Sequence, residues 1–529
     1  MIDQPRTSGS IHPWLANGLF FAVLALYCAV IAEGRFFPTV DGPVHTYNAR
    51  LLGDLLAGDT HSTSFFQLSD VPVPYWTSTV LMWLFGIILG PAEVERAMVL
   101  AIILFTALSY RWFLKAVSAQ STLGSLLIFP FLWTVPLQLG FFNFCLGLGL
   151  LFFVLSWWLH RSPGQRIDRA VLVGVLLFVL LYFTHLMLFV IALGAITGHA
   201  IWMQRQVPTL PFLRKAMGRI MIMALPALLL CGWYAVANDG IGPKGASMPF
   251  AQRFEWLVNG QPLLTLVWDR EQPMVRMVQA GLLLLTAAAI WNRRKSLLTP
   301  AGGDAWGWAA LLFFGACLVL PDGFSTGTIV LVRLQLIGLI MWATWCAAQR
   351  MHDGVRVLGV AIAIAGALWQ LHFHWGTVRS LRAEAEDLYT VHSAIGDDAT
   401  VLPLNYSGNW MHANFADYLG TYKNTIVLDN FVARYGHAPI RWRNEMEPFN
   451  DVGNFDSSLQ PCIDLDAWTE RTGRTMDHVL TAQMPEQPGD SCTLDAKRQL
   501  LQLYDLTTTS PSGKVKLYSL KPGTAPHRR

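Results

Sequence analysis

Two side chains with acid–base chemistry, Asp41 and His45, stand four residues apart just after the first long apolar segment. They belong to the stretch FFPTVDGPVHTYNARLLGDLL, residues 36–56. A carboxylate can take the proton of an attacking hydroxyl group, and a neighbouring histidine can bind or orient that group. The pair therefore predicts a catalytic site, with Asp41 as general base and His45 as its assistant.

The residues after this pair predict a helix. Pro43 suits a first helical turn, and apolar side chains then recur at helical spacing, namely Val44, Tyr47, Leu51, Leu52, Leu55 and Leu56. We expect an amphipathic helix from Pro43 onward, lying along the outer membrane surface. A simpler role for Asp41 is that of a helix N-cap, worth about 1 kcal/mol. His45 would then be a solvated side chain.

The composition indicates a membrane protein. The chain has 529 residues, of which 53% are hydrophobic and 14% are charged, whereas roughly 25% is usual for soluble proteins. Many apolar segments approach the roughly 20 residues that cross a bilayer. The basic residues lie in short connections between these segments, as positive-inside topology requires. This pattern excludes nucleic acid as a partner and predicts a polytopic α-helical protein bound to lipid.

The apolar segments give eleven to thirteen predicted spans. Residues 170–203 are too long for one span and should divide near Thr184 and His185, because a single helix would reach about 50 Å. Residues 123–137 contain Pro130 and Pro136, and we expect this segment not to span. An inside N-terminus and an outside C-terminus require an odd number of spans, so eleven are favoured. The segments are 14–31, 75–89, 97–114, 123–137, 141–159, 170–203, 219–237, 275–291, 305–320, 329–347 and 355–373.

The membrane domain is predicted to comprise residues 1–375, and three pieces of the chain are predicted on the external side of the membrane. Two are loops, residues 33–74 and 238–273, and the third is an α/β domain at residues 376–529, where strand-like and helical runs alternate. This last piece contains Cys462 and Cys492. They would form a disulfide in an oxidising compartment and would otherwise stay reduced.

This plan resembles the GT-C superfamily of polytopic glycosyltransferases. In that superfamily an acidic residue follows the first span and precedes a helix parallel to the membrane. Here Asp41 in TVDGPVHTYNARLL and the helix from Pro43 match these features, and the likeness is closest to bacterial members without an assigned substrate. The resemblance implies an inverting transfer of a sugar from a polyprenyl-phosphate carrier to an external lipid-linked glycan, lipid or protein.

The same resemblance implies a bacterial inner membrane location, with the C-terminal domain external or periplasmic. The Asp-Asp and Glu-x-Asp pairs of some GT-C branches do not occur in the matching loop. The cofactor therefore stays unknown, with a divalent metal as one possibility.

A donor phosphate would need a cation. Arg333 lies a few residues inside an otherwise apolar segment, where a charge either faces a cavity or extends to the membrane surface. By its position it resembles the phosphate-binding residue of GT-C enzymes. The second loop adds Lys244, Arg253 and Arg270 as further candidates, two of which we expect to be ordinary surface charges. Asp269 and Glu271, on either side of Arg270, are alternative acids.

Other side chains are candidates for a cavity or an acceptor site. His185 lies near the predicted break between two spans, where it either lines a cavity or bonds a backbone carbonyl. In the C-terminal domain, NYSGNWMHANFADYLGTY gathers Trp410, His412 and Asp417. Aromatic rings with a few polar groups suit a glycan, although the same residues would also fit the core of a small domain. His372 and His374 diverge on a helix and do not form a metal pair.

Three other functions compete with this prediction. A polymerase or ligase of lipid-linked glycans would rely on arginines in large central loops. A transporter or flippase would show inverted repeats and broken helices around midplane charges, and the sequence shows no repeat. A non-catalytic scaffold would use Asp41 only as a cap, so Asp41→Asn would leave its function intact.

Overall fold

The computed structural model describes residues 12–118, 122–160, 168–204, 210–237, 248–295, 301, 303–323, 328–455 and 461–523. The chain forms two compact units, each made from separate stretches of sequence. The first unit comprises Met1–Ile31 and Leu100–Gly376, and the second comprises Ala32–Val99 and Thr377–Arg529.

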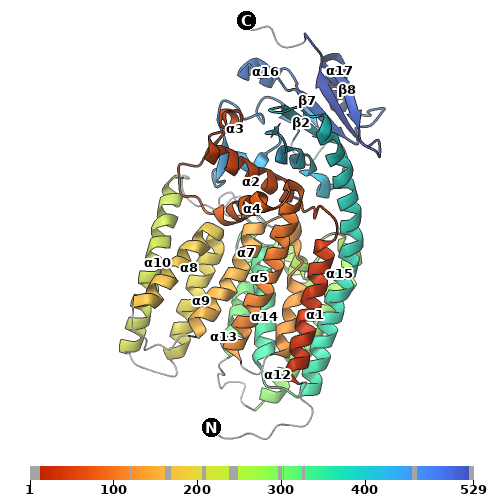
Figure 1. Ribbon diagram of the computed structural model, residues 1–529. Helices are drawn as coiled ribbons and strands as arrows, with labels where there is room; N and C mark the ends of the chain where they lie inside the picture. Colours follow the sequence, from red (N-terminus) through yellow and green to blue (C-terminus); the bar gives the residue numbers. More distant parts are fainter. Residues whose placement is uncertain are drawn as a thin grey trace. The chain divides into compact units, whose positions relative to one another are not determined.

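Long helices that lie side by side form the first unit (Figure 1). Helix α14 lies among them. It is the most deeply buried of the membrane-length helices, since 89% of its apolar stretch is buried inside the protein. It packs against α13, α12 and the 3-10 segment η2. The helices concerned are α1 (Pro13–Ala32), α5 (Val94–Val117), α7 (Phe142–Leu159), α8 (Asp168–Thr184), α9 (Leu186–Gln204), α10 (Leu210–Ala237), α12 (Trp268–Arg293), α13 (Asp304–Val319), α14 (Val330–Ala348) and α15 (Asp353–Tyr389).

Eight helices of the described residues are long and apolar enough to cross a membrane, and three more apolar helices are shorter. Fewer helices than the predicted eleven to thirteen spans therefore reach membrane length. Residues 75–89, which were predicted to span the membrane, account for part of this difference in number. This segment forms α4 (Trp76–Ile88), whose 13 residues extend only about 20 Å, short of a core of about 30 Å.

Two predictions about the helices are confirmed. The long apolar block divides at His185, with α8 ending at Thr184 and α9 beginning at Leu186. Residues 123–137 form no span but a 3-10 helix, η2 (Leu123–Phe131), and one turn, α6 (Val135–Gln138). Proline removes a backbone donor and clashes with the preceding turn, which explains why no long helix forms there.

The second unit contains a five-stranded sheet in the order β3-β2-β7-β9-β8. Strands β3 (Ile426–Val427), β2 (Thr400–Asn405) and β7 (His478–Ala482) are parallel. Strands β9 (Val515–Leu520) and β8 (Tyr504–Thr509) complete the sheet in antiparallel pairing. The expected α/β character of the C-terminal region is present in this sheet and in helix α17 (Ser491–Leu503), which packs beside β8.

The first predicted loop belongs to this second unit. It forms α2 (Gly42–Ala57), α3 (Thr60–Phe65) and β1 (Phe66–Leu68), and β1 pairs antiparallel with β4 (Ile440–Trp442). The domain division at residue 375 assigned this loop to the membrane domain. Strand pairing and side-chain burial instead attach residues 32–99 to the C-terminal region.

Helix α2 exists as predicted, but much of its apolar face is covered by protein. Val44, Tyr47, Leu51 and Leu52 are buried, whereas Leu56 at the far end is exposed. The helix packs against α4, beside which it lies in Figure 1, and against the 3-10 segment η6 (Phe415–Thr421). Its hydrophobic side therefore stabilises the second unit by burial.

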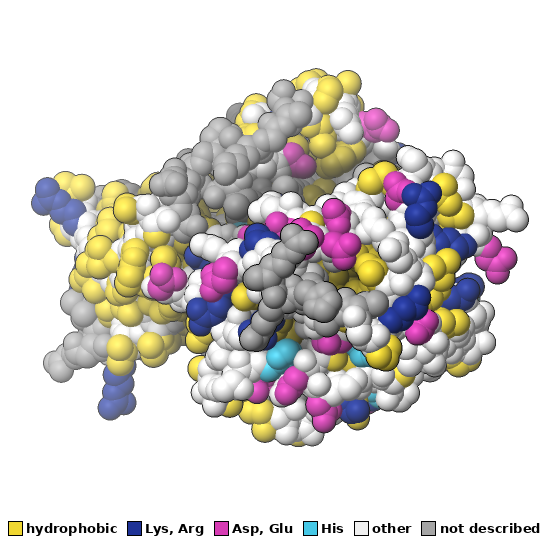
Figure 2. Space-filling model, turned by 90° about the horizontal axis from the view of Figure 1, so that it is seen from above, with side chains coloured by type: hydrophobic (Ala, Val, Ile, Leu, Met, Phe, Trp, Pro, Cys, Tyr) yellow, Lys and Arg dark blue, Asp and Glu magenta, His cyan; other side chains and the backbone are white. Residues whose placement is uncertain are grey.

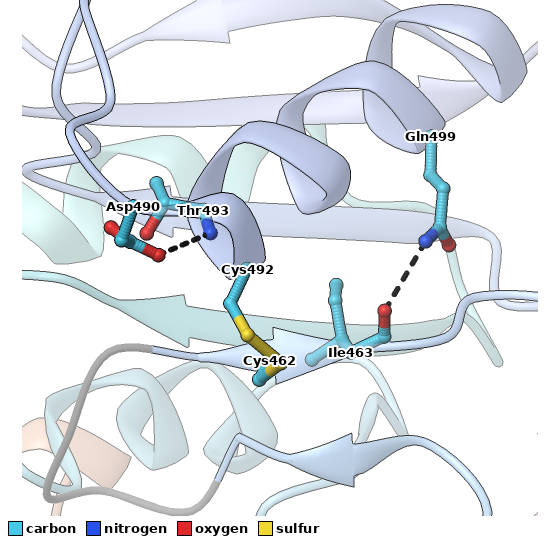
Figure 3. Close-up of a disulfide and its surroundings, with 6 residues drawn as sticks. All are labelled: Cys462, Ile463, Asp490, Cys492, Thr493 and Gln499. Atoms are coloured by element: carbon cyan, nitrogen blue, oxygen red, sulfur yellow. Dashed lines mark hydrogen bonds between the residues drawn. A yellow bond between two sulfur atoms is a disulfide. The ribbon is translucent and has the colours of Figure 1, made fainter.

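A disulfide joins Cys462 to Cys492, 30 residues further along the chain. Figure 3 shows that it ties β6 (Cys462–Ile463) to the first turn of α17. Asp490 caps that helix by accepting a hydrogen bond of 2.7 Å from Thr493 N, and Gln499 Nε2 donates to Ile463 O at 3.2 Å. The two cysteines thus adopt the paired state that the sequence allowed.

Candidate functional site

Asp41 stands at the N-cap position of α2, yet its side chain makes no capping hydrogen bond. Thr39 takes that role, because its Oγ1 accepts from Gly42 N at 3.0 Å. Thr39 N and Oγ1 also donate to Oε1 of the fully buried Glu95, each at 2.8 Å. The expected cap role of Asp41 is therefore wrong, since a neighbour satisfies the helix terminus.

The carboxylate of Asp41 faces the C-terminal part of the second unit. Asn414 Nδ2 donates to Asp41 Oδ1 at 3.2 Å and to Val40 O at 2.9 Å. Asn414 is 1% exposed and immediately precedes η6. Residues 373 positions apart in the sequence thus meet at this point. His45 lies half-buried in the first turn of α2, with its backbone N bonded to Asp41 O at 3.0 Å.

Two more carboxyl groups lie near Asp41. Asp417 is completely buried within η6, and Asp429, which is 4% exposed, follows strand β3. Burial raises the pKa of Asp417 well above its usual range, and the charges of Asp429 and Asp41 raise it further. We call Asp41, Asp417 and Asp429 the carboxyl trio.

The raised pKa of Asp417 favours its protonated form. Apart from the neighbouring Asp429, no N–H or O–H group of the described residues donates to either carboxyl oxygen of Asp417. Asp417 and Asp429 can share a hydrogen bond when one of the two groups is protonated. The arrangement can therefore store a proton beside the half-exposed Asp41. Within the described ranges, no set of three or more His, Cys, Asp or Glu side chains has the arrangement of a metal site.

A cavity of about 270 Å³ lies within the second unit, next to Asp429. It sits where parallel strands end, since Asn405 closes β2, Ala482 closes β7 and Asp429 follows β3. In open sheets with parallel strands, ligands bind at this edge. The lining is mainly apolar, and its polar side chains are Glu384, Asp387, Asn405, His412, Asp429, Gln483, Ser512 and Lys514.

His412 is the predicted acceptor residue that lines this cavity. Its Nε2 lies against the carboxyl group of Glu384 and 3.0 Å from Asn409 Nδ2. Burial lowers the pKa of His412, while Glu384 opposes that shift. Of the other two candidates, Asp417 belongs to the carboxyl trio, and Trp410 is 46% exposed and does not line the cavity.

The predicted phosphate-binding residue Arg333 lies in the first unit. Its guanidinium stands 4.3 Å from the ring centre of Phe141 and 5.7 Å from that of Phe144. A cation placed over the face of an aromatic ring is attracted to it, and this cation–π attraction is stronger where water is excluded. The ring of His185 packs edge-on against Phe144 at 5.4 Å. The structure thus groups Arg333 and His185 around a shared aromatic side chain.

The three second-loop candidates differ in their surroundings. Arg253 is 8% exposed and donates to the backbone carbonyls of Met248, Leu318 and Leu320, so it closes the C-terminal end of α13. Arg270 is exposed in the first turn of α12, and Lys244 lies outside the described residues. Burial raises the pKa of Asp322, and the charges of Arg333 and Arg253 partly oppose that shift.

The sequence did not single out Asn414 or Asp429. Asn414 carries no sequence signal that distinguishes it from a surface amide. Asp429 ends the strand-like run TIVLD, and a carboxylate at the carboxyl end of a parallel strand is a usable signal. In comparisons with known proteins, neither a family model nor a curated protein sequence matches this chain.

Proposed function

We propose that this chain is an integral membrane glycosyltransferase that moves a sugar from a polyprenyl-phosphate carrier to an external acceptor. The eight apolar helices support a membrane location. The observation that carries the proposal is the carboxyl trio, in which Asp41 does not cap its helix and faces Asn414. A buried carboxyl group with a raised pKa, such as that of Asp417, is typical of acid–base sites.

In this proposal Asp41 takes the proton of the acceptor hydroxyl group. The acceptor oxygen then attacks the anomeric carbon of the donor sugar, and the bond from that carbon to the phosphate oxygen breaks. The electron pair leaves on the polyprenyl phosphate, and the configuration at the anomeric carbon inverts. Asp417 keeps a proton within the trio, and His45 orients the acceptor.

Arg333 is assigned to the donor phosphate. A guanidinium can bind phosphate through two hydrogen bonds, and that of Arg333 lies against the ring of Phe141. Arg253 is assigned a structural role, since it binds three backbone carbonyls. His185 is assigned to the surroundings of Arg333, because its ring packs against Phe144. The disulfide supports an oxidising side for the second unit, which fits the periplasmic face of a bacterial inner membrane.

The proposal is tested by sugar transfer in lipid nanodiscs, with a panel of polyprenyl-phosphate-linked sugars and detergent-extracted glycan acceptors. We expect Asp41→Asn to lower turnover at least about 100-fold, the effect typical of losing a general base. Asp70→Asn is the matched control, because Asp70 is exposed in the same predicted loop. Equal turnover of wild type and Asp41→Asn would overturn the role of Asp41.

Native mass spectrometry tests whether Arg333 holds the donor phosphate and whether a competing function fits better. Wild-type protein should retain a polyprenyl-phosphate species, and Arg333→Ala should lose it, while Arg270→Ala serves as the exposed control. Retention of bulk phospholipids alone, equally in all three proteins, would remove Arg333 from the donor site. Movement of an intact carrier across vesicles without sugar transfer would favour a flippase.

A further inference from the structure

The lining of the cavity at the carboxyl edge of the parallel strands combines two kinds of side chain. Phe415 and Phe455 contribute aromatic surface, and Leu404 and Leu480 contribute aliphatic surface. The same lining contains carboxyl, amide and hydroxyl groups. A ligand that contacts both kinds of side chain must itself have apolar surface and several hydrogen-bonding groups.

The charges of the lining favour a ligand without phosphate. Glu384, Asp387 and Asp429 contribute acidic groups, whereas Lys514 is the one Lys or Arg in the lining. Asp387 already accepts from Ser510 Oγ at 2.7 Å and from Ser512 N at 2.9 Å. An anion placed among these carboxylates would meet like charge in a partly enclosed site. A neutral or amine-bearing ligand meets no such repulsion.

The size and the groups of the site fit one carbohydrate ring. A cavity of about 270 Å³ lies just below the roughly 300–1,000 Å³ of most ligand pockets, so it has room for a single ring. The C–H face of a sugar packs on aromatic surface, and its hydroxyl groups donate to carboxylates. Because Asp429 belongs both to this lining and to the carboxyl trio, a bound ring would lie next to the proposed general-base site.

We propose that this cavity binds one uncharged or amino-bearing sugar ring, which is the acceptor of the transfer reaction. The acceptor role depends on the function proposed above, whereas the binding itself does not. The acidic lining further predicts that a sugar phosphate is rejected. On the face drawn in Figure 2, acidic and basic side chains of the described residues are interspersed.

The test is saturation-transfer-difference NMR with the full chain in nanodiscs and three probes, methyl β-glucoside, glucosamine and glucose 6-phosphate. No donor is added. We expect signals from the first two probes and at least 10-fold weaker binding of the third. Ala383→Trp should remove the signals by filling the cavity, since Ala383 lines it and is exposed on α15. Ala57→Trp, exposed at the end of α2, is the matched control.

The outcomes separate the two proposals. Equal signals in wild type and Ala383→Trp, or tighter binding of glucose 6-phosphate, would overturn the carbohydrate site. If transfer then still occurs and depends on Asp41, the proposed function stands without this acceptor site. If the sugars bind and Ala383→Trp abolishes binding while no donor supports transfer, the site stands and the proposed function fails.

Discussion

The two units each bury a carboxyl group, and the two groups have opposite surroundings. In the first unit, Glu271 is fully buried and surrounded by donors. Thr265 Oγ1 donates to it at 2.6 Å, Leu266 N donates at 3.0 Å, and His374 Nε2 lies against the same carboxylate. In the second unit, Asp417 is equally buried, yet its neighbours are two more acids.

This contrast shows how a buried acid that stabilises a fold differs from one that destabilises it. Burial of a charge is costly unless hydrogen bonds and opposite charges compensate it. Glu271 has that compensation and closes the start of α12, because Leu266 N and Val267 N donate to its Oε2. Asp417 lacks it, and such uncompensated groups are concentrated at functional sites.

The largest effect on stability is expected for Glu271→Ala. The substitution leaves Thr265, His374 and two backbone N–H groups without their acceptor, which should cost about 3–5 kcal/mol. Thermal unfolding followed by tryptophan fluorescence would measure the loss. Asp269→Ala, exposed in the same helical turn, is the control. If both variants unfold at the same temperature, Glu271 does not stabilise the first unit.

A smaller loss, about 2 kcal/mol, is expected for Thr39→Val. Its hydroxyl group caps α2 at Gly42 and donates to Glu95, which keeps Thr39 N and Tyr418 Oη as donors. Thr39→Ser keeps the hydroxyl group and should unfold like the wild type. The same thermal measurement applies, and equal loss in both variants would contradict the hydrogen-bonding role.

Asp417→Asn should stabilise the protein, by about 1 kcal/mol or a few degrees in Tm at neutral pH. Because the pKa of Asp417 is raised in the folded state, the folded chain holds a proton that the unfolded chain releases above the usual range of an aspartate. Stability is therefore lost as the pH rises through that window. The gain in Asp417→Asn should shrink toward pH 4, and a gain independent of pH would contradict this account.

The smallest effect on stability, under about 0.5 kcal/mol, is expected for Asp41→Asn. Asp41 makes no capping hydrogen bond, so its removal leaves the start of α2 intact. The free energy of unfolding in denaturant, measured beside that of Thr39→Val, ranks the two positions. Because asparagine is itself a good N-cap, Asp41→Ala is the variant that tests the cap role, and a loss of about 1 kcal/mol or more in Asp41→Ala would restore it.

Local features of the fold were predictable from sequence. Pro130 and Pro136 explain why residues 123–137 form no span, and the length of the apolar block at residues 170–203 explains its division at His185. The placement of residues 33–74 was not predictable, because β1 pairs with residues of β4 far along the chain. Apolar periodicity shows that α2 has a buried face but does not show whether lipid or protein covers it.

The candidate site was predictable only in part. Asp41, His412 and Asp417 were named from residue type and position, and the structure assigns all three to the second unit. The role of Asn414 depends on a contact between distant segments, which no local pattern encodes, whereas the position of Asp429 after a strand-like run was a usable signal. The same limit applies to Arg253, whose charge suggested phosphate and whose hydrogen bonds end a helix.

The interleaved construction of the second unit has a consequence for biosynthesis. Asn414, the hydrogen-bond partner of Asp41, is synthesised 373 residues later. At roughly 5–20 residues per second, the delay between the two is about 20–75 s. During that interval β1 has an unpaired edge, and the apolar side of α2 lacks its cover from η6. Residues 42–68 therefore have no native cover from η6 and β4 until the chain has been synthesised to residue 442.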